Sequence, residues 1–475
     1  MNESTNVTEA SGLYIENRTF EELAVGDTAE LTRTLRPQDI ELFAVMSGDV
    51  NPAHVDEEYA RSDRFHKVIA HGMWGGALIS AVLGTELPGP GTIYLNQSLS
   101  FRRPVGIGDT VTVRVTVREM NAENHRVILD CRCWNQDGES VISGEAEVLA
   151  PTQKVRRPRA VLPEVHLHER GARYRRLIEA THDLAPIATA VIHPCEPVAL
   201  TGALEAAREG LVVPVLVGPE ARIRATAESA GVSLDDTEIV DVPHSHAAAE
   251  RAVALAREGR VEALMKGSLH TDEVMEAVVD RTAGLRTERR MSHVYALDVP
   301  HYPRAVFITD GAVNIYPSLA DKHDIVQNAI DLLHALAIDT PRVALLSAVE
   351  TVDAKFPSTV EAAALCKMAQ RGQITGGVLD GPLAFDNAIS AEAARTKGID
   401  SPVAGKADIL VAPDLEAGNM MAKQLIHLAG ADAAGIVLGA RVPVMLTSRS
   451  DDTLSRLASA ALAQLYVRHW GRDAS

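Results

Sequence analysis

The sequence predicts an α+β domain followed by a two-lobed α/β domain with mostly parallel sheets. The chain has 475 residues, which is too long for one ordinary hydrophobic core, so more than one domain is expected. Up to about Leu149, apolar residues alternate with polar ones, as they do in half-buried antiparallel strands. From about residue 165, short apolar segments alternate with helical ones, which is typical of a parallel sheet covered on both faces.

The first region combines alternating segments with one long apolar segment. Alternation is found at Ile93–Phe101, Val111–Val117, Val127–Cys133 and Ile142–Val148. The segment Gly72–Thr85 contains no charged residue, and a helix that is apolar all round must be enclosed. One buried helix wrapped by an antiparallel sheet is the hot-dog arrangement. We place this domain at residues 15–150.

A basic, proline-bearing stretch at residues 151–164 is expected to be a linker, and the α/β domain follows at residues 165–475. Its length suggests two lobes with a cleft between them. Ser358 and Glu361 have capping-box spacing and predict a helix start. Strands are expected at Val212–Val217, Glu262–Met265, Ala305–Thr309, Val343–Ser347, Gly377–Leu379, Asp408–Val411, Ile436–Leu438 and Val444–Leu446.

Composition excludes several classes of function. The net charge is −18, with 64 acidic against 46 basic residues, which argues against a nucleic-acid partner. Residues 1–9 are polar and lack the apolar stretch of a signal peptide, and no apolar run is long enough to span a bilayer. Four cysteines are too few for a disulfide scaffold. We therefore expect a cytoplasmic protein without a membrane partner.

The most informative motif is Ser47–Pro52 followed by His54. Upstream apolar residues recur at helical spacing, and the Asn-Pro pair at its end is a turn signal. Asp49 should therefore leave a helix end, with His54 on the loop beyond it. An acid and a base on one loop can share a water molecule, as the hydration of an activated double bond requires.

The same reaction needs donors for the enolate oxygen of a thioester. Free backbone N–H groups are expected where the apolar helix starts, at Ala70–Met73, because the first N–H groups of a helix lack partners. Gly72 would allow close approach of the ligand. Such donors can contribute roughly 3 kcal/mol each in the transition state.

Several motifs in order resemble the MaoC-like (R)-specific enoyl-CoA hydratases over about residues 15–150. The resemblance implies a hot-dog fold, usually dimeric, and hydration of trans-2-enoyl-CoA to (R)-3-hydroxyacyl-CoA. It implies that Asp49 and His54 are the catalytic pair, that Gly72 polarises the thioester carbonyl, and that Ser80 supports the site. The matching motifs are Ser47–His54, His71–Met73, Leu87–Tyr94, and Phe101–Val105 through Gly108 and Asp109.

In open α/β sheets, ligands lie at the carboxyl ends of the strands. Neither a Walker loop nor a Rossmann fingerprint occurs, so ATP and NAD receive little support. Glycine, charge and hydroxyl groups are instead expected to concentrate at one edge of the sheet. They lie at Lys266–Ser268, Thr309–Gly311, Glu350, Asp380–Pro382, Pro413–Asp414 and Gly439–Arg441.

Residues 170–470 resemble the phosphate acetyl/butyryltransferases, with the butyryl type expected to be nearer. The implied reaction converts acyl-CoA and phosphate reversibly into acyl phosphate and CoA. It uses no metal and no bound cofactor, and CoA thioesters and phosphate are substrates. The matching motifs are Met265–Ser268, Gly284–Thr287, Ser292–Val294, Ala348–Glu350, Lys355–Pro357, Asp380–Ala388, Glu416–Asn419 and Thr447–Arg449.

Within that resemblance, a base must take the thiol proton and cations must hold the phosphate. Asp310 and Asp386 are the candidate bases. The loop after Val343–Ser347 lacks the arginine of the acetyl enzymes, which weakens the case for acetyl specificity. The candidate CoA- and phosphate-binding residues are Lys266, Gly267, Ser268, Arg290, Ser292 and Lys355.

The leading hypothesis is a bifunctional homo-oligomeric enzyme that acts on small-molecule acyl-CoA substrates. In the main alternative, only the first half is an enzyme, and the second is a non-catalytic CoA-binding or oligomerising module. A weaker alternative makes the second half a decarboxylating dehydrogenase of similar two-lobed architecture.

Overall fold

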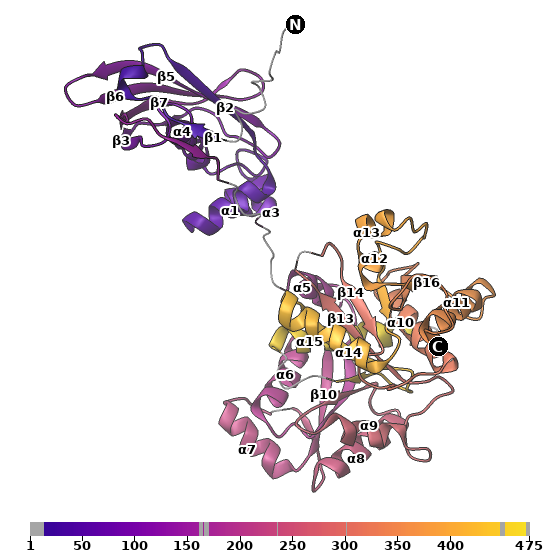
Figure 1. Cartoon of the computed structure of the whole chain (residues 1–475). Coiled ribbons are helices and arrows are strands. Elements are labelled where there is room, and N and C mark those ends of the chain that lie inside the picture. The colour runs from indigo at the N-terminus through magenta and orange to yellow at the C-terminus, as the bar shows by residue number, and fades with distance from the viewer. Residues whose placement is uncertain are drawn as a thin grey trace. The chain divides into compact units, whose positions relative to one another are not determined.

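The computed structural model describes residues 14–160, 165, 171–234, 236–300, 302–446 and 452–471. The chain divides into two compact units, residues 1–167 and 168–475. The first unit is coloured indigo to magenta in Figure 1, and the second runs from magenta to yellow. Among the described residues, no helix combines the length and the apolar character needed to cross a membrane.

The first unit is built on an antiparallel sheet that packs against one buried helix. The strand order is β2 (Thr28–Thr34), β5 (Thr110–Asn121), β6 (Arg126–Trp134), β7 (Ser140–Leu149) and β3 (Ile93–Gln97), and β4 (Ser100–Phe101) also pairs with β7. Helix α4 (Gly72–Thr85) buries Ile79, Val82 and Leu83 completely, in one apolar cluster with the inward valines of β5. The predicted hot-dog fold is confirmed.

Short elements precede α4 and carry the first site. Helix α1 (Pro37–Ser47) has proline at its first position, where its fixed φ suits the helix and no N–H partner is needed. It ends at Gly48, whose φ of 75° is left-handed and favours glycine. Two further helices follow, α2 (Pro52–Val55) and α3 (Glu57–Ser62), while the 3₁₀ helix η1 (Phe20–Glu22) lies before β2.

Part of the predicted linker is paired with the start of the first unit. Strand β8 (Arg156–Pro158) pairs antiparallel with β1 (Tyr14–Glu16). Next to β1, the Nδ2 of buried Asn17 donates to the carbonyls of Pro90, at 2.9 Å, and Gln153, at 2.8 Å. These bonds tie residues 151–158 to the hot-dog fold, because a buried amide needs its hydrogen-bond partners.

Among its described residues, the second unit holds eleven strands in one mixed, mostly parallel sheet. This confirms the predicted α/β class. In sheet order the strands are β11 (Glu238–Asp241), β10 (Val212–Gly218), β9 (Ile187–Ile192), β12 (Ala263–Lys266), β19 (Val444–Met445), β18 (Asp432–Leu438), β13 (Ser292–Asp298), β14 (Val306–Thr309), β17 (Ile409–Val411), β15 (Arg342–Leu346) and β16 (Val378–Leu383).

Helices cover this sheet, and each end of it has an apolar cluster of its own. One cluster joins β9, β10 and β12 to α8 and α9, and another joins β14, β15 and β17 to α12–α14. The two ends are the two lobes, with β10 near one and β16 near the other in Figure 1. The helices are α5 (Ala172–Glu179), α6 (Pro197–Arg208), α7 (Glu220–Ala230), α8 (Ser245–Arg257), α9 (Thr271–Val279), α10 (Leu319–Ala335), α11 (Pro357–Gln370), α12 (Phe385–Ile389), α13 (Ala391–Thr396), α14 (Leu415–Ala429) and α15 (Thr453–Trp470).

The prediction that Ser358 caps a helix was wrong. Helix α11 begins one residue earlier, at Pro357, and Phe356 occupies the N-cap position. Proline at the first helical position has its φ preset and needs no N–H partner, so it sets the start of the helix here. The Ser358 hydroxyl instead lies 2.9 Å from that of Ser347.

The prediction that all the strand ends share one edge was also wrong. Strand β13 runs antiparallel to both of its neighbours, β18 and β14, and β18 is antiparallel to β19. Because of these three antiparallel pairs, the strands from β11 to β19 in sheet order point in the opposite direction to those from β14 to β16. The carboxyl end of β14, with Asp310, lies beside the start of β13, while the end of β12, with Lys266, points the other way. Residues 380–382 lie inside β16 and not after it.

Candidate active sites

The segment after α1 presents Asp49 and His54 through a chain of short-range hydrogen bonds. The Asp49 N–H donates to the Ser47 hydroxyl at 3.2 Å, and Asp49 Oδ1 accepts the Asn51 N–H at 3.2 Å. The Asn51 side chain then caps α2 by accepting the Ala53 N–H. His54 therefore lies in a one-turn helix, and not on an open loop as predicted from the sequence.

His54 is held with one ring nitrogen engaged and the other available. Its Nδ1 lies 2.8 Å from the backbone carbonyl of Ile69. A carbonyl can only accept a hydrogen bond, so Nδ1 carries the proton and Nε2 of the neutral ring has a free lone pair. This is the tautomer that a general base requires.

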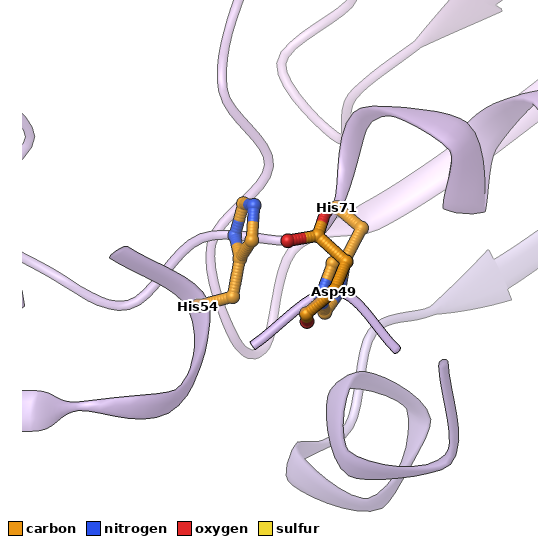
Figure 2. Close-up of side chains that lie close together, drawn as sticks. All are labelled: Asp49, His54 and His71. Carbon is orange, nitrogen blue, oxygen red and sulfur yellow. The ribbon is translucent and has the colours of Figure 1, made fainter. Parts of the chain in front are cut away.

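A third side chain, that of His71, joins this pair. His71 is buried, and its Nε2 donates to the Asp49 carbonyl at 2.9 Å. Its ring packs against those of His54 and Phe43, with centroids 4.1 and 4.9 Å away. Figure 2 shows the Asp49 carboxylate pointing toward the His54 imidazole, with His71 beside it. His71 therefore holds both members of the predicted pair in place.

Asp49, His54 and His71 also form a donor set of the kind that binds metals. One ligand atom from each lies within 4.8 Å of the others. However, one nitrogen of each ring is already engaged with a backbone carbonyl. The exposed Asp49 carboxylate and the free His54 nitrogen fit an acid–base pair directly.

A cavity of about 250 Å³ opens beside this cluster. His54, His71 and Gly72 are among its lining residues. A side chain at Gly72 would begin 3.1 Å from the Phe101 ring, so glycine keeps the start of α4 open. The apolar part of the lining comes from Trp74, Val111, Val141 and Ile142, and three arginines, Arg64, Arg102 and Arg103, also contribute.

Ser80 does not join this group. It lies on α4 eight residues beyond Gly72, about 12 Å along the helix axis, and it is exposed. It does not line the cavity that holds His54. Its supporting role remains a prediction from the resemblance.

In the second unit, Lys266 is the last residue of β12, and Gly267 and Ser268 follow it next to the end of β9. The N–H groups of Gly267 and Ser268 donate to the carbonyls of Ile192 and His193, both at 2.9 Å. A side chain at Gly267 would begin 2.4 Å from the Ile192 oxygen, so the approach of the two strand ends requires glycine. Within the described part of the chain, the buried Ser268 hydroxyl has no hydrogen-bond partner.

Two other predicted residues, Arg290 and Asp310, come together around Asn314, whereas the Ser292 hydroxyl accepts a hydrogen bond from Asn328 at 2.9 Å. Arg290 Nε donates to Asn314 Oδ1 at 2.6 Å, and Asn314 Nδ2 donates to Asp310. Asp310 is buried, and its carboxylate also accepts backbone N–H groups of residues 312–314 and, at 3.3 Å, that of His293. Its acceptor sites are thus occupied in holding the loop after β14.

A cavity of about 560 Å³ lies against Arg290. It is lined by α9, by residues 286–291, by the loop after β14 and by the first turns of α10. Arg286, Arg289 and Arg290 all contribute to the lining. Thr271 brings the N-terminus of α9, so the cavity offers helix N–H groups together with cationic side chains.

Of the residues predicted for this unit, Arg290 lines this cavity. The others do not, namely Lys266, Gly267, Ser268, Ser292, Asp310, Lys355 and Asp386. Lys355 is exposed on the loop after β15. Asp386 pairs with Lys397 at 3.1 Å, and the bond from Lys397 lowers the pKa of Asp386. A lowered pKa makes a carboxylate a weaker base.

Sequence reasoning missed His71 as a member of the first cluster and Asn314 as the link in the second. Both are reached through contacts between distant segments, which no local pattern reveals. The Thr447–Arg449 motif lies outside the described residues.

Two family models match the chain. The model described as "Phosphate acetyl/butaryl transferase" matches residues 244–464, and the model described as "MaoC like domain" matches residues 23–129. The two matched ranges lie in different compact units.

Individual proteins match each unit. The phosphate acetyltransferase of Rhizobium meliloti is 65% identical over 296 residues, 62% of this chain and 94% of that protein. The phosphate butyryltransferase of Clostridium acetobutylicum is 42% identical over 283 residues, 60% of this chain and 93% of that protein. The expectation that butyryl-type relatives are nearer was therefore wrong.

The structure described as R-hydratase PhaJ1 from Pseudomonas aeruginosa is 46% identical, with a TM-score of 0.32. It covers 33% of this chain and 99% of that chain. The family matches and the similarity to the Rhizobium meliloti protein show that the chain belongs to the phosphate acetyl/butyryltransferase family and also carries a MaoC-like domain.

Proposed function

We propose that the chain is a bifunctional CoA-thioester enzyme. Residues 15–150 hydrate trans-2-enoyl-CoA to (R)-3-hydroxyacyl-CoA, and residues 165–475 exchange CoA for phosphate on an acyl group, with residues 151–164 between them. The observation that carries the proposal is that each unit matches its own family model and has a cavity that predicted residues line, His54 and Gly72 in the first unit and Arg290 in the second.

In the hydration, a water molecule adds across the α,β double bond of the thioester. The free His54 nitrogen, with Asp49, removes a water proton as the oxygen attacks Cβ, and the pair then returns that proton to Cα. Negative charge develops on the thioester oxygen. Backbone N–H groups at Gly72 and Met73 are positioned to stabilise it, since the first N–H groups of a helix lack intrahelical partners. The arginines of the cavity lining suit the phosphates of CoA.

In the transfer, a phosphate oxygen attacks the thioester carbonyl carbon, the C–S bond breaks, and CoA leaves as a thiolate that takes up a proton. The arginines beside the larger cavity, above all Arg290, supply the positive charge that holds the phosphate groups. The carboxylate of Asp310 is occupied by hydrogen bonds from its own loop, and Lys397 lowers the pKa of Asp386, which makes that carboxylate a weaker base. We therefore base the proposal for this site on anion binding.

Substitution of Asp49 separates the two activities. Asp49→Asn keeps the size of the side chain and removes its charge, so hydration of crotonyl-CoA should fall at least about 100-fold. Phosphate-dependent release of free thiol from acyl-CoA should stay at the wild-type rate. If transfer disappeared together with hydration in a folded protein, the two-site proposal would be wrong.

The transferase activity is tested with acetyl-, butyryl- and 3-hydroxybutyryl-CoA, with and without phosphate. We expect phosphate-dependent thiol release, and the preferred acyl group would identify the substrate. No release from any of them, in a protein that still hydrates crotonyl-CoA, would favour the alternative of a non-catalytic CoA-binding or oligomerising second half. An absorbance change of NAD with hydroxy-diacids would instead indicate the dehydrogenase alternative.

We also propose that the protein is a homo-oligomer. Edge strand β3 supports this, because Ile93, Tyr94 and Leu95 on it are exposed although apolar, as is the nearby Phe101. Exposed apolar side chains on an unpaired edge favour association. Light scattering should give a mass of at least twice that of the chain.

A further inference from the structure

The arginine-bearing wall of the larger cavity is a segment without regular structure. Residues 286–291 line the cavity, and β13 begins only at Ser292. The conformation of such a segment depends on contacts with neighbouring elements, because it lacks a helix or strand ladder of its own. Those contacts determine where the guanidinium of Arg290 points.

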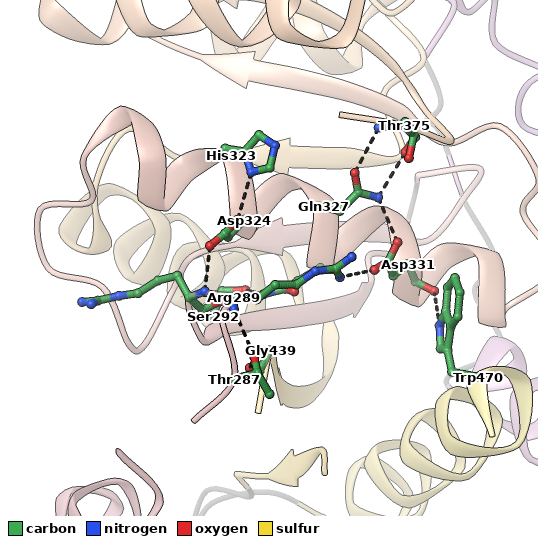
Figure 3. Close-up of polar contacts among 12 residues, drawn as sticks. Thr287, Arg289, Ser292, His323, Asp324, Gln327, Asp331, Thr375, Gly439 and Trp470 are labelled. Carbon is green, nitrogen blue, oxygen red and sulfur yellow. Dashed lines mark hydrogen bonds and ion pairs between the residues drawn. The ribbon is translucent and has the colours of Figure 1, made fainter. Parts of the chain in front are cut away.

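Side chains on one face of α10 supply the contacts that hold residues 286–291. Asp324 accepts the Arg290 N–H at 2.8 Å, and Asn328 Nδ2 donates both to the Arg290 carbonyl and to the Ser292 hydroxyl, each at 2.9 Å. One turn further on, Asp331 pairs with the guanidinium of Arg289. The spacing of 324, 328 and 331 places the three side chains on one helix face. Figure 3 shows α10 lying along this segment.

Asn328 is the most tightly enclosed of the three. Its side chain is fully buried, and it donates one hydrogen bond to the arginine-bearing segment, at the Arg290 carbonyl, and one to Ser292, the first residue of β13. Gly439 packs directly over it, since a side chain there would begin 2.9 Å from Asn328 Nδ2 and 2.6 Å from the Arg290 oxygen. Only a donor satisfies the Arg290 carbonyl, so aspartate, although of the same size, cannot replace asparagine at this contact.

We propose that Asn328 is a positioning residue of the acyl-transfer site. With Asp324 it fixes both backbone polar groups of Arg290, and so fixes the direction in which that side chain leaves the wall. The guanidinium is thereby preorganised, with Nε on Asn314 at 2.6 Å, and needs no ordering when an anion binds. The inference rests on the proposed transferase function. It assigns control of the anion affinity of the cavity to Asn328, a residue that does not itself line the cavity.

The test compares Asn328→Asp and Asn328→Ser with the wild type in the phosphate-dependent thiol-release assay. We expect KM for phosphate or for acyl-CoA to rise at least about tenfold, while kcat changes less than about threefold, because anion binding is weakened and the reacting groups are untouched. Calorimetric titration with CoA alone should show the same weakening. The serine variant, which introduces no charge, serves if the aspartate variant fails to fold.

Gln464→Glu is the matched control. Gln464 is also fully buried, and its amide donates to the carbonyls of Leu184 and Ala185, away from the cavity lining. It should lose stability and keep both KM values. If folded Asn328 variants kept the wild-type KM values and CoA affinity, the positioning role of Asn328 would be wrong, but the proposed transferase function would still hold. A wild-type protein with neither turnover nor CoA binding would overturn the proposed function and this inference together.

Discussion

Asp310, Asp386 and His54 are all titratable, but their surroundings give them different roles. The carboxylate of Asp310 is occupied by hydrogen bonds from residues 312–314, while Lys397 lowers the pKa of Asp386 and so makes that carboxylate a weaker base. His54 has one nitrogen fixed by the Ile69 carbonyl and the other free. The sequence predicts which residue types a reaction needs, but their hydrogen-bond partners decide which of them can perform it.

His293 provides a prediction at this scale. Complete burial lowers the pKa of His293, against the opposing influence of Asp310. The unfolded chain should titrate near 6.5, so below that pH it binds a proton that the folded state rejects. The contribution of His293 to the free energy of unfolding should be complete above about pH 6.5. As the pH drops from there toward the lower pKa of His293 in the folded state, the free energy of unfolding should fall by about 1.4 kcal/mol for each pH unit.

Thermal unfolding of the wild type and His293→Gln between pH 7.5 and 5 measures this effect. The melting temperature of the wild type should fall by several degrees more than that of the variant. Equal slopes for the two proteins would show that His293 does not contribute to acid sensitivity.

Single elements could be predicted where the signal is local. The absence of charge marks the bounds of α4, and strict alternation predicts β5, β6 and β7. Weaker signals failed. The capping-box spacing at Ser358 placed the start of α11 wrongly, because Pro357 is the first residue of that helix. Strands β2, β9 and β13 were not predicted. Strands covered on both faces are identified by a continuous apolar run, and buried polar residues interrupt that run in β9 and β13, at Thr189 in the first and at Ser292, His293 and Asp298 in the second.

The turn between β18 and β19 provides a prediction at the scale of an element. Gly439 has a φ of 84°, and a side chain there would meet the Arg290 carbonyl. Gly439→Ala should therefore cost about 1 kcal/mol for the backbone conformation, and more for displacing residues 290 and 328. KM for an anionic substrate should rise in parallel.

Gly398→Ala is the reference for this change. Gly398 also has a positive φ, of 65°, but a side chain there would enter open space. Chemical denaturation should show the smaller loss for Gly398→Ala. Similar losses in both variants would mean that the contact with Arg290 contributes nothing.

Across the whole molecule, each compact unit encloses its own apolar core. The cluster of the first unit contains residues from Leu23 to Ala150, and the other three clusters begin at Tyr174 or later. Separate cores imply that each unit can fold without the other. Hydrogen bonds assign residues 153–158 to the first unit, because this stretch is bonded to Asn17 and to β1.

Expression of shortened chains checks this boundary. Residues 14–160 alone should unfold cooperatively and hydrate crotonyl-CoA. Residues 14–150 should be less stable, because Asn17 would lose its bonds to Gln153 and to the Val155 N–H, each contributing about 1 kcal/mol. Equal midpoints in denaturant for the two fragments would contradict this role of the linker.

The sequence by itself determined the two domain types, the enclosed helix, the strands that alternate, and the residues to examine first, because these follow from composition, periodicity and motifs along the chain. The tertiary structure decided where strand direction reverses, that His71 holds Asp49 and His54, and that Asn328 holds Arg290. These features depend on hydrogen bonds between segments tens of residues apart. Their partners are brought together only by packing of the whole unit.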